Sequence, residues 1–203
     1  MPDTDAPANP LLVSTRNAHK VAEIRAILEP GFLVSDLSSA PSMPEIEETG
    51  ATFEENATLK AVAASRHFDG WVIADDSGLE VDALGGAPGV RSARYAGEKS
   101  SDAANNELLL RNLLLFHGPE RSARFRCVIV LARNGQKVAA FPGAVEGAIT
   151  TSPSGGGGFG YDPLFVPEGF LETFAQLGGG IKNRFSHRAR ALVALENWLK
   201  KLA

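Results

Sequence analysis

The chain has very little cysteine, and this scarcity excludes several classes of protein. Among its 203 residues there is one cysteine, Cys127, which lies in the apolar run over residues 125–132. A single thiol cannot form an internal disulfide, and it cannot supply the several thiolates of a structural zinc site. We therefore expect a buried core cysteine in a protein of a reducing compartment, which predicts a cytoplasmic location.

Long hydrophobic runs are absent as well. No apolar segment of the sequence approaches the roughly 20 residues that span a membrane. The first ten residues, MPDTDAPANP, have neither the basic region nor the apolar region of a secretion signal. We expect no membrane association, and we interpret residues 1–10 as a short flexible tail.

The sequence also has no excess of positive charge. Its 20 Lys and Arg residues are outnumbered by 24 Asp and Glu residues, which gives a formal net charge of −4 at pH 7. A general nucleic-acid-binding protein is normally basic, so we expect no nucleic-acid partner. A compact anionic ligand remains compatible with this balance, because it needs only a local cluster of cations.

The apolar residues that are present predict one full hydrophobic core. They make up 44% of the chain, and the length fits a single domain, which we place at residues 11–203. The elements expected in chain order are a strand at 11–14, a helix capped by Asn17 and ending before Pro30, a strand at 32–34, a helix from the capping-box pair Thr52 and Glu55 to about residue 68, strands at 71–74 and near 79–81, and a helix at 101–116.

The second half of the chain predicts a hairpin and a final helix. Asn134-Gly135 is a strong hairpin signal between strands at 123–132 and 137–149, and a helix follows at about 186–200. Strand–helix alternation combined with a hairpin indicates an α/β fold with a mixed sheet. The leucines of the helix at 101–116 cover more than one stripe, so this helix is buried on two sides or forms a subunit contact.

The most informative segment begins with the apolar run at 71–74. It leads directly into Asp75-Asp76-Ser77-Gly78. Two carboxylates at the end of a buried strand can hold a hard cation such as Mg²⁺ and leave coordination positions for substrate phosphate. The alternative is a surface turn, because Asp, Ser and Gly favour turns for conformational reasons.

Two further segments carry positive charge at predicted helix starts. In residues 15–20, TRNAHK, a strand meets a helix N-terminus, where free N–H groups favour an anion. Lys182, Arg184, His187, Arg188 and Arg190 surround the start of the last helix, where cations are unfavourable unless a ligand neutralises them. The alternative is a solvated helix end capped by Asn for the first segment and a solvated basic face for the second.

Two weaker signals complete the set. The run GGGGFGYDP at 155–163 joins a flexible loop to two aromatic residues, which can stack on a base or simply fold into the core. Glu45, Glu47 and Glu48 precede the second helix, and one of them is a candidate to join the Asp pair around a metal. Charge runs are otherwise usually solvated.

Taken in order, these segments resemble the inosine triphosphate pyrophosphatase family. The resemblance is carried by SxRNxxK at 14–20, EETGxTFxENAxLKA at 47–61, ADDSGLxVDxLGGAPGVxSARYxGE at 74–98, GGFGYDPLF at 157–165 and SHRxxAL at 186–192. It extends from about residue 11 to 200. It implies an elongated mixed sheet flanked by helices, two lobes around a central cleft, and a homodimer. It also implies Mg²⁺-dependent hydrolysis of ITP, dITP and XTP to the monophosphate and pyrophosphate, which removes deaminated purines from the nucleotide pool.

The same resemblance assigns residues to roles. It places metal binding at Glu48 and Asp76 and makes Asp76 the proton acceptor; we add Asp75 as a supporting ligand or orienting residue. Substrate contacts fall at Thr15, Arg16, Asn17, Ala18, His19, Lys20, Ser77, Phe159, Gly160, Tyr161, Asp162, Lys182, His187 and Arg188. Many relatives have an acidic residue before the lysine that matches Lys182, whereas here Ile181 precedes it, so the position of Lys182 is the open point.

Two rival interpretations remain open at this stage. One is a phosphatase that uses the same metal on nucleotides or small phosphoesters and releases orthophosphate. The other is a nucleotide-sensing or nucleic-acid-binding module without turnover, against which the negative charge and the paired acidic residues argue.

Overall fold

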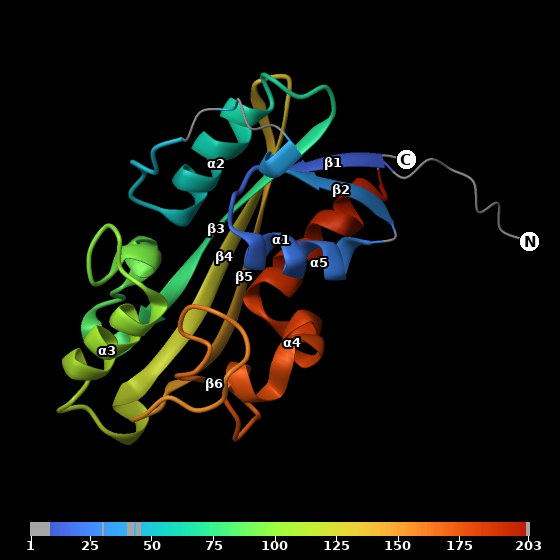
Figure 1. Cartoon of the computed structure of the whole chain (residues 1–203). Coiled ribbons are helices and arrows are strands. Elements are labelled where there is room, and N and C mark those ends of the chain that lie inside the picture. Colours follow the sequence, from blue (N-terminus) through green and yellow to red (C-terminus); the bar gives the residue numbers. More distant parts are fainter. Residues whose placement is uncertain (1–8, 30, 40–42, 44–45, 202–203) are drawn as a thin grey trace, which may run out of the picture.

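The computed structural model describes residues 9–29, 31–39, 43 and 46–201, and these form one mixed sheet with helices on both faces (Figure 1). The strands are β1 (Asn9–Val13), β2 (Phe32–Asp36), β3 (Trp71–Val81), β4 (Ser122–Arg133), β5 (Gln136–Ile149) and β6 (Phe165–Pro167). The α-helices are α1 (Ala18–Leu28), α2 (Phe53–Ala64), α3 (Asp102–Asn112), α4 (Phe174–Phe185) and α5 (His187–Leu199). Short 3₁₀ helices are η1 (Leu37–Ser39), η2 (Asp82–Leu84), η3 (Gly89–Arg94) and η4 (Gly118–Arg121).

The sheet has the order β2-β1-β3-β4-β5-β6. β1 is parallel to β2 and β3, and the remaining neighbours are antiparallel, so the predicted mixed α/β sheet is confirmed. β3, β4 and β5 run along the length of the molecule (Figure 1). At one end they are accompanied by β1, β2 and α2, and at the other by β6, α3 and α4.

Alternation along β3 explains how the helices cover the sheet. Successive side chains of a strand point to opposite faces. Ala74 packs against Ala57 and Ala61 of α2, whereas Ile73 packs in the cluster that contains Ala191 of α5. β3 therefore presents one set of side chains to α2 and the other set to α5, with α1 beside it.

Local signals in the sequence account for most helix starts and for the hairpin. The Asn17 side chain caps α1 by accepting from the backbone N–H groups of His19 and Lys20, and Thr52 and Glu55 form the predicted capping box of α2. The hairpin between β4 and β5 turns at Asn134 and Gly135, whose φ angles are 52° and 74°. Positive φ at both positions is the geometry that Asn-Gly favours.

The turn interpretation of residues 75–78 is wrong. These residues lie inside β3, which pairs with β4 without interruption from Val72 opposite Ala132 to Val81 opposite Ala123. Gly78 is required by close packing and not by a bend, because an added Cβ would lie 2.4 Å from the carbonyl oxygen of Gly89 and 2.4 Å from Ser92 Oγ. Local turn preference is overridden here by cross-strand pairing and tight contact with η3.

Several predicted boundaries also need correction. β1 begins at Asn9, so the last two residues of the predicted tail belong to the sheet, and residues 1–8 lie outside the described part. α2 ends at Ala64 instead of about residue 68, and α3 ends at Asn112. The leucine run continues beyond α3 as a turn, in which Leu114 and Leu115 are 72% and 83% exposed. Of the two predicted alternatives, burial on two sides is therefore wrong for the end of the leucine run, and a subunit contact there stays a prediction.

The sequence reading missed α4 and β6. α4 contains the run Gly178-Gly179-Gly180, which weakens any helical pattern, and Gly178 has a non-helical φ of 76° and ψ of 168° that kinks the helix. β6 is only three residues long. None of the helices in the described ranges is long and apolar enough to cross a membrane.

Candidate active site

A cleft of about 320 Å³ lies where β1 ends and, among the described residues, β3 continues with a strand partner, β4, on one side only. Pairing between the two strands stops at Val13 and Ile73, and the backbone N–H of Ser14 then donates to the carbonyl oxygen of Ile73. Beyond that point the edge of β3 opens into the cleft, so side chains from both faces of the strand reach the same space. This explains how Asp76 and Ser77, which point to opposite faces, both line it.

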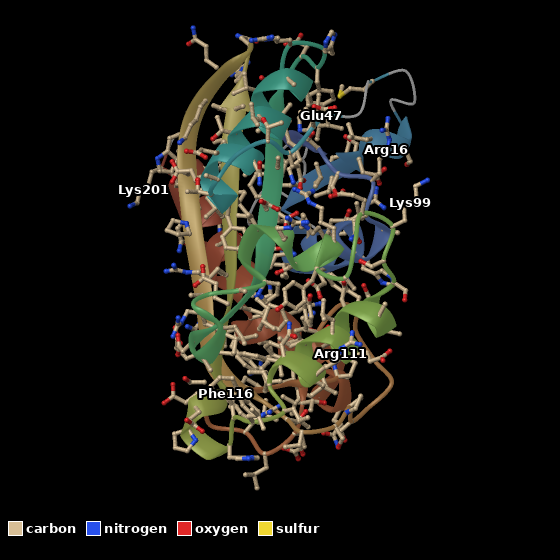
Figure 2. The ribbon with its side chains drawn as sticks, turned by 90° about the vertical axis from the view of Figure 1, so that its left-hand side faces the viewer. Arg16, Glu47, Lys99, Arg111, Phe116 and Lys201 are labelled. Carbon is tan, nitrogen blue, oxygen red and sulfur yellow. The ribbon has the colours of Figure 1, made fainter. Side chains whose placement is uncertain are left out.

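The cleft gathers most of the residues predicted from the sequence. Its lining includes Thr15, Arg16, Asn17, Lys20, Glu48, Asp76, Ser77, Phe159, Gly160, Tyr161, Asp162, Lys182, His187 and Arg188. In Figure 2, Arg16 and Glu47 are labelled in the upper part of the molecule and Arg111 and Phe116 in the lower part, with α3. Three predicted residues are not part of the lining: Ala18, His19 and Asp75.

Asp75 lies beneath the cleft, away from Asp76. Its buried carboxylate pairs with Lys20 Nζ at 3.1 Å and with Arg188 Nη2 at 2.8 Å, and it accepts from the Ser77 hydroxyl. Burial alone raises the pKa of Asp75, but the charges of Lys20, Arg188 and Lys60 outweigh burial and hold the pKa well below its usual range. The Asp75 carboxylate is therefore placed to orient Lys20 and Arg188, and it is turned away from the cleft that Glu48 and Asp76 line.

Asp76 faces α2 and lies in a different electrostatic environment. Its Oδ2 accepts from Asn56 Nδ2 at 3.1 Å. Burial raises the pKa of Asp76; Lys60 and Lys20 lower it without cancelling that effect, and the nearby Glu48 carboxylate raises it further. Neighbouring aspartates on one strand thus have pKa values displaced in opposite directions, a pattern that marks different chemical roles.

Glu48 and Asp76 converge on a single cation. Lys60 Nζ lies 2.5 Å from Glu48 Oε1 and 3.8 Å from Asp76 Oδ1. Burial lowers the pKa of Lys60, but the carboxylates of Asp76, Asp75 and Glu48 outweigh it and the pKa is raised. The ammonium group thus stands where two carboxylates from different segments meet. Glu47 is exposed, and Glu45 lies outside the described residues.

This pair of carboxylates fits a magnesium ion. Mg²⁺ is usually held by one or two carboxylates together with substrate phosphates and water, and not by an all-protein cage. Within the described residues no group of three or more His, Cys, Asp and Glu side chains is placed to hold a metal. Glu48 and Asp76 already surround one positive charge, the Lys60 ammonium group. Because they are only two ligands, phosphate oxygens and water would have to complete the coordination of a magnesium ion.

The opposite end of the cleft is aromatic. The Phe159 ring stacks on His19 with a centroid distance of 5.2 Å, and Lys182 Nζ lies 4.5 Å from the Phe159 centroid. The loop is fixed by Asp162 Oδ2, which accepts from the Phe159 N–H, and by Asp102 Oδ2, which accepts from the Gly160 N–H. Tyr161 donates from its hydroxyl to the carbonyl oxygen of Ser92.

The position of Lys182 is settled by two carboxylates. Its Nζ lies 2.6 Å from Asp162 Oδ2 and 2.8 Å from Glu23 Oε1. Ile181, which directly precedes the lysine, is 38% exposed, so its side chain does not fix the lysine's position. Lys182 consequently lies at the aromatic end of the cleft.

His187 and Arg188 begin α5 and are both buried. Burial and the charges of Arg188 and Lys182 lower the pKa of His187 well below its usual range, so its imidazole is neutral at pH 7. The ring stacks on Phe125 at 4.8 Å, and its Nδ1 is buried without a hydrogen-bond partner in the described structure. Arg188 pairs with Asp75 and Glu23, whereas Arg184 and Arg190 of the same sequence cluster are exposed.

Sequence reasoning missed Lys60, Asn56 and Glu23. Asn56 and Lys60 are four residues apart on α2, and Lys20 and Glu23 are three apart on α1, so each pair shares a helix face. Glu23 is the carboxylate that joins Lys182 and Arg188, which come from different helices. The spacing of three and four residues could be seen in the sequence, but only the fold shows which side chains these residues contact.

The fold and the cleft define an α/β protein with a pocket that has a paired-carboxylate end and an aromatic end. The chain matches the model of the Ham1 family over residues 11–198. It is 50% identical over 186 residues to the dITP/XTP pyrophosphatase of Bacillus licheniformis, an alignment that covers 91% of this chain and 95% of that protein. It is 47% identical over 190 residues to the dITP/XTP pyrophosphatase of Bacillus subtilis, an alignment that covers 93% of this chain and 96% of that protein.

Solved structures agree with the sequence comparison. The Staphylococcus aureus Ham1 protein superposes with a TM-score of 0.84 at 41% identity, covering 96% of this chain and 100% of that one. A nucleoside-triphosphatase, dITP/XTP pyrophosphatase, from Mycobacterium abscessus gives a TM-score of 0.73 at 44% identity, covering 92% and 98%. The chain belongs to the Ham1 family, and the resemblance to inosine triphosphate pyrophosphatases inferred from its motifs is confirmed.

Proposed function

We propose that this protein hydrolyses the non-canonical purine nucleotides dITP, XTP and ITP to the nucleoside monophosphate and pyrophosphate, with Mg²⁺ as cofactor. The observation that carries the proposal is one cleft with Glu48 and Asp76 converging at one end and a fixed aromatic loop at the other. The similar proteins named dITP/XTP pyrophosphatase support the substrate class.

The phosphate tail belongs at the end of the cleft formed by β1, α1 and α2. Lys20, Lys60 and Arg188 each pair with a carboxylate there, so their positive charges are already balanced. A polyanionic substrate therefore brings negative charge that these cations alone do not neutralise. Glu48 and Asp76 would hold Mg²⁺, which when bound would supply positive charge beside the phosphate tail and lower the pKa of a bound water. Thr15 and Lys20 orient the tail from the start of α1.

Asp76 is the group that accepts a proton from the attacking water. A general base works best when its pKa lies near the working pH, and burial raises the pKa of Asp76 in that direction. Asn56 holds the carboxylate from α2, so its lone pairs keep a fixed direction. Positioning of the water and neutralisation of the departing pyrophosphate supply most of the rate enhancement.

The base belongs at the aromatic end of the cleft. Phe159, whose ring stacks on His19, supplies an aromatic side chain against which a purine packs, and the neutral His187 offers an unpartnered Nδ1 to the polar edge of the base. Hypoxanthine and xanthine carry oxygen at C6, where adenine carries an amino group. A buried hydrogen-bonding group that pairs with the oxygen at C6 is left without a partner when the base carries an amino group there. This mismatch is the physical basis for selecting hypoxanthine and xanthine over adenine.

Product analysis by HPLC tests the reaction directly. With Mg²⁺, purified protein is expected to convert dITP, XTP and ITP to monophosphate and pyrophosphate, to leave ATP largely intact, and to lose turnover when EDTA removes the metal. Nucleoside diphosphate with orthophosphate would instead identify a phosphatase. An absence of turnover on every purine nucleotide would identify a binding protein.

Replacing His187 by phenylalanine tests base selection. Phenylalanine keeps the stack on Phe125 but removes the polar edge, so the ratio of kcat/KM for dITP to kcat/KM for dATP is expected to fall about tenfold. The matched control is His67→Phe, because His67 is exposed and does not line the cleft. Equal losses of kcat/KM for both nucleotides would contradict a base-reading role for His187.

We also propose a cytoplasmic homodimer. The exposed Leu114 and Leu115 after α3 support a subunit contact, since neighbouring large apolar side chains are seldom left in water without a partner. The buried thiol of Cys127, which forms no disulfide, suits a reducing compartment. Light scattering coupled to size-exclusion chromatography measures the oligomeric state directly.

A further inference from the structure

The Lys60 ammonium group lies at the meeting point of three chain segments. It contacts Glu48 Oε1 at 2.5 Å, the carbonyl oxygen of Asp75 at 2.8 Å and Asp76 Oδ1 at 3.8 Å. The lysine comes from α2, the aspartates from β3, and Glu48 from the segment that precedes α2. Its side chain is only 12% exposed, so these oxygens are its main surroundings.

These oxygens form a cation site, and the cation that occupies it is the Lys60 ammonium group. Carboxylate and carbonyl oxygens around one positive charge are also what a hard divalent ion takes. A divalent ion cannot share this position with an ammonium group, because like charges repel at such distances. Unlike a metal ion, the ammonium is carried on a flexible four-carbon stem with three rotatable donors, so it can move to another anion nearby.

We propose that Lys60 is a resident counter-ion that excludes the metal from the empty cleft and yields its place when nucleotide phosphate arrives. The inference rests on the proposed function and deepens it, because it sets how metal and substrate bind. The phosphate tail provides Lys60 with a new anionic partner and provides the metal with its missing ligands. Metal and nucleotide therefore bind with positive coupling, and each strengthens the binding of the other by the same factor.

The alternative is a purely structural lysine that anchors the edge of β3. Lys60 donates to the carbonyl oxygen of Asp75, and its own carbonyl oxygen accepts from the Ser14 hydroxyl. A structural anchor does not exclude a metal from the carboxylates, so the two roles differ in metal affinity. Lys60→Met separates them, because methionine retains the length of the apolar stem and removes the charge.

Mn²⁺ binding, followed by electron paramagnetic resonance and calorimetry, provides the readout without any turnover. Wild-type protein alone is expected to bind Mn²⁺ weakly, and a non-hydrolysable dITP analogue is expected to tighten binding at least tenfold. Lys60→Met is expected to bind Mn²⁺ at least tenfold more tightly than wild type without nucleotide, and the tightening by the analogue is expected to shrink correspondingly.

Two control variants sharpen the comparison. Lys137→Met makes the same change of charge at another lysine–glutamate pair, Lys137 with Glu54 of α2, and is expected to leave Mn²⁺ affinity within about twofold of wild type. Lys60→Arg keeps the positive charge and is expected to keep weak Mn²⁺ binding in the absence of nucleotide.

A folded Lys60→Met variant with wild-type Mn²⁺ affinity overturns the inference. Should that variant not fold, wild-type protein alone decides, because equal Mn²⁺ affinity with and without the analogue overturns it as well. Failure of the proposed function is seen separately. Protein that shows the expected coupling but hydrolyses no purine triphosphate retains the role of Lys60 and refutes the reaction, whereas turnover of dITP without coupling refutes only the role of Lys60.

Discussion

Replacing Asp76 by asparagine is expected to lower kcat for dITP by about 10³-fold. The amide keeps the size of the side chain and can still accept from Asn56 Nδ2, but it cannot take a proton from water and is a poor ligand for Mg²⁺. The fold is expected to be as stable as wild type or more stable. Burial and Glu48 raise the pKa of Asp76, so ionising this carboxyl costs more free energy in the folded protein than in the unfolded chain, and an uncharged amide avoids that cost.

Steady-state kinetics tests the expected fall in kcat, and thermal unfolding of the same preparations tests the expected stability. Asp82→Asn is the control, because Asp82 directly follows β3 and pairs with Arg124 outside the cleft. Near-normal turnover by Asp76→Asn would remove Asp76 from the chemistry. A large drop in unfolding temperature would show that the carboxylate is part of the scaffold.

Replacing Asp75 by asparagine is expected to have the opposite profile, with stability as the main loss. The fully buried carboxylate balances Lys20 and Arg188, and its removal leaves these cations without their shared partner. Breaking a buried ion pair from one side costs about 3–5 kcal/mol of unfolding free energy. Turnover is expected to fall too, because Lys20 and Arg188 lose the anion that orients them.

The pH dependence gives a second signature of Asp75. The pKa of this carboxyl is lower in the folded protein than its ordinary value of 3.8, so its contribution to stability is fully present above that value and is lost as the pH falls toward the folded pKa. The stability difference between wild type and Asp75→Asn is therefore expected to be constant from about pH 5 to 7 and to shrink below about pH 4.

Urea unfolding followed by circular dichroism at several pH values measures this difference. Asp69→Asn is a suitable control, because Asp69 is an exposed aspartate in the segment between α2 and β3. A variant of Asp75 that unfolds within about 1 kcal/mol of wild type at pH 7 would contradict the role of a buried counter-ion.

Features governed by neighbours in sequence were predictable. The cap at Asn17, the capping box at Thr52 and Glu55, and the hairpin at Asn134-Gly135 each depend on a few adjacent residues. The motif resemblance also brought together most residues that line the cleft. These signals are local or shared with relatives, and neither requires knowledge of the packing.

Features governed by distant partners were not predictable. Asp75 and Asp76 look alike in the sequence, and only the alternation along β3 sends one to Arg188 and the other to Asn56. Gly78 looks like a turn residue until η3 is seen to pack against it. α4 was hidden by three glycines, although Lys182 needs that helix to reach Glu23 and Asp162.

Beyond the end of β1, one edge of β3 faces the cleft and, within the described part of the chain, has no strand beside it. An unpaired strand edge invites another strand to join it, which is a common route to aggregation. Here the carbonyl oxygen of Asp75 is occupied by Lys60, and the N–H of Ser77 by the Asp76 carboxylate. Farther along, Ser92 Oγ occupies the N–H of Leu79. Side chains that line the cleft thus also block strand-to-strand aggregation at this edge, and a redesign of the pocket for another ligand must keep the edge covered.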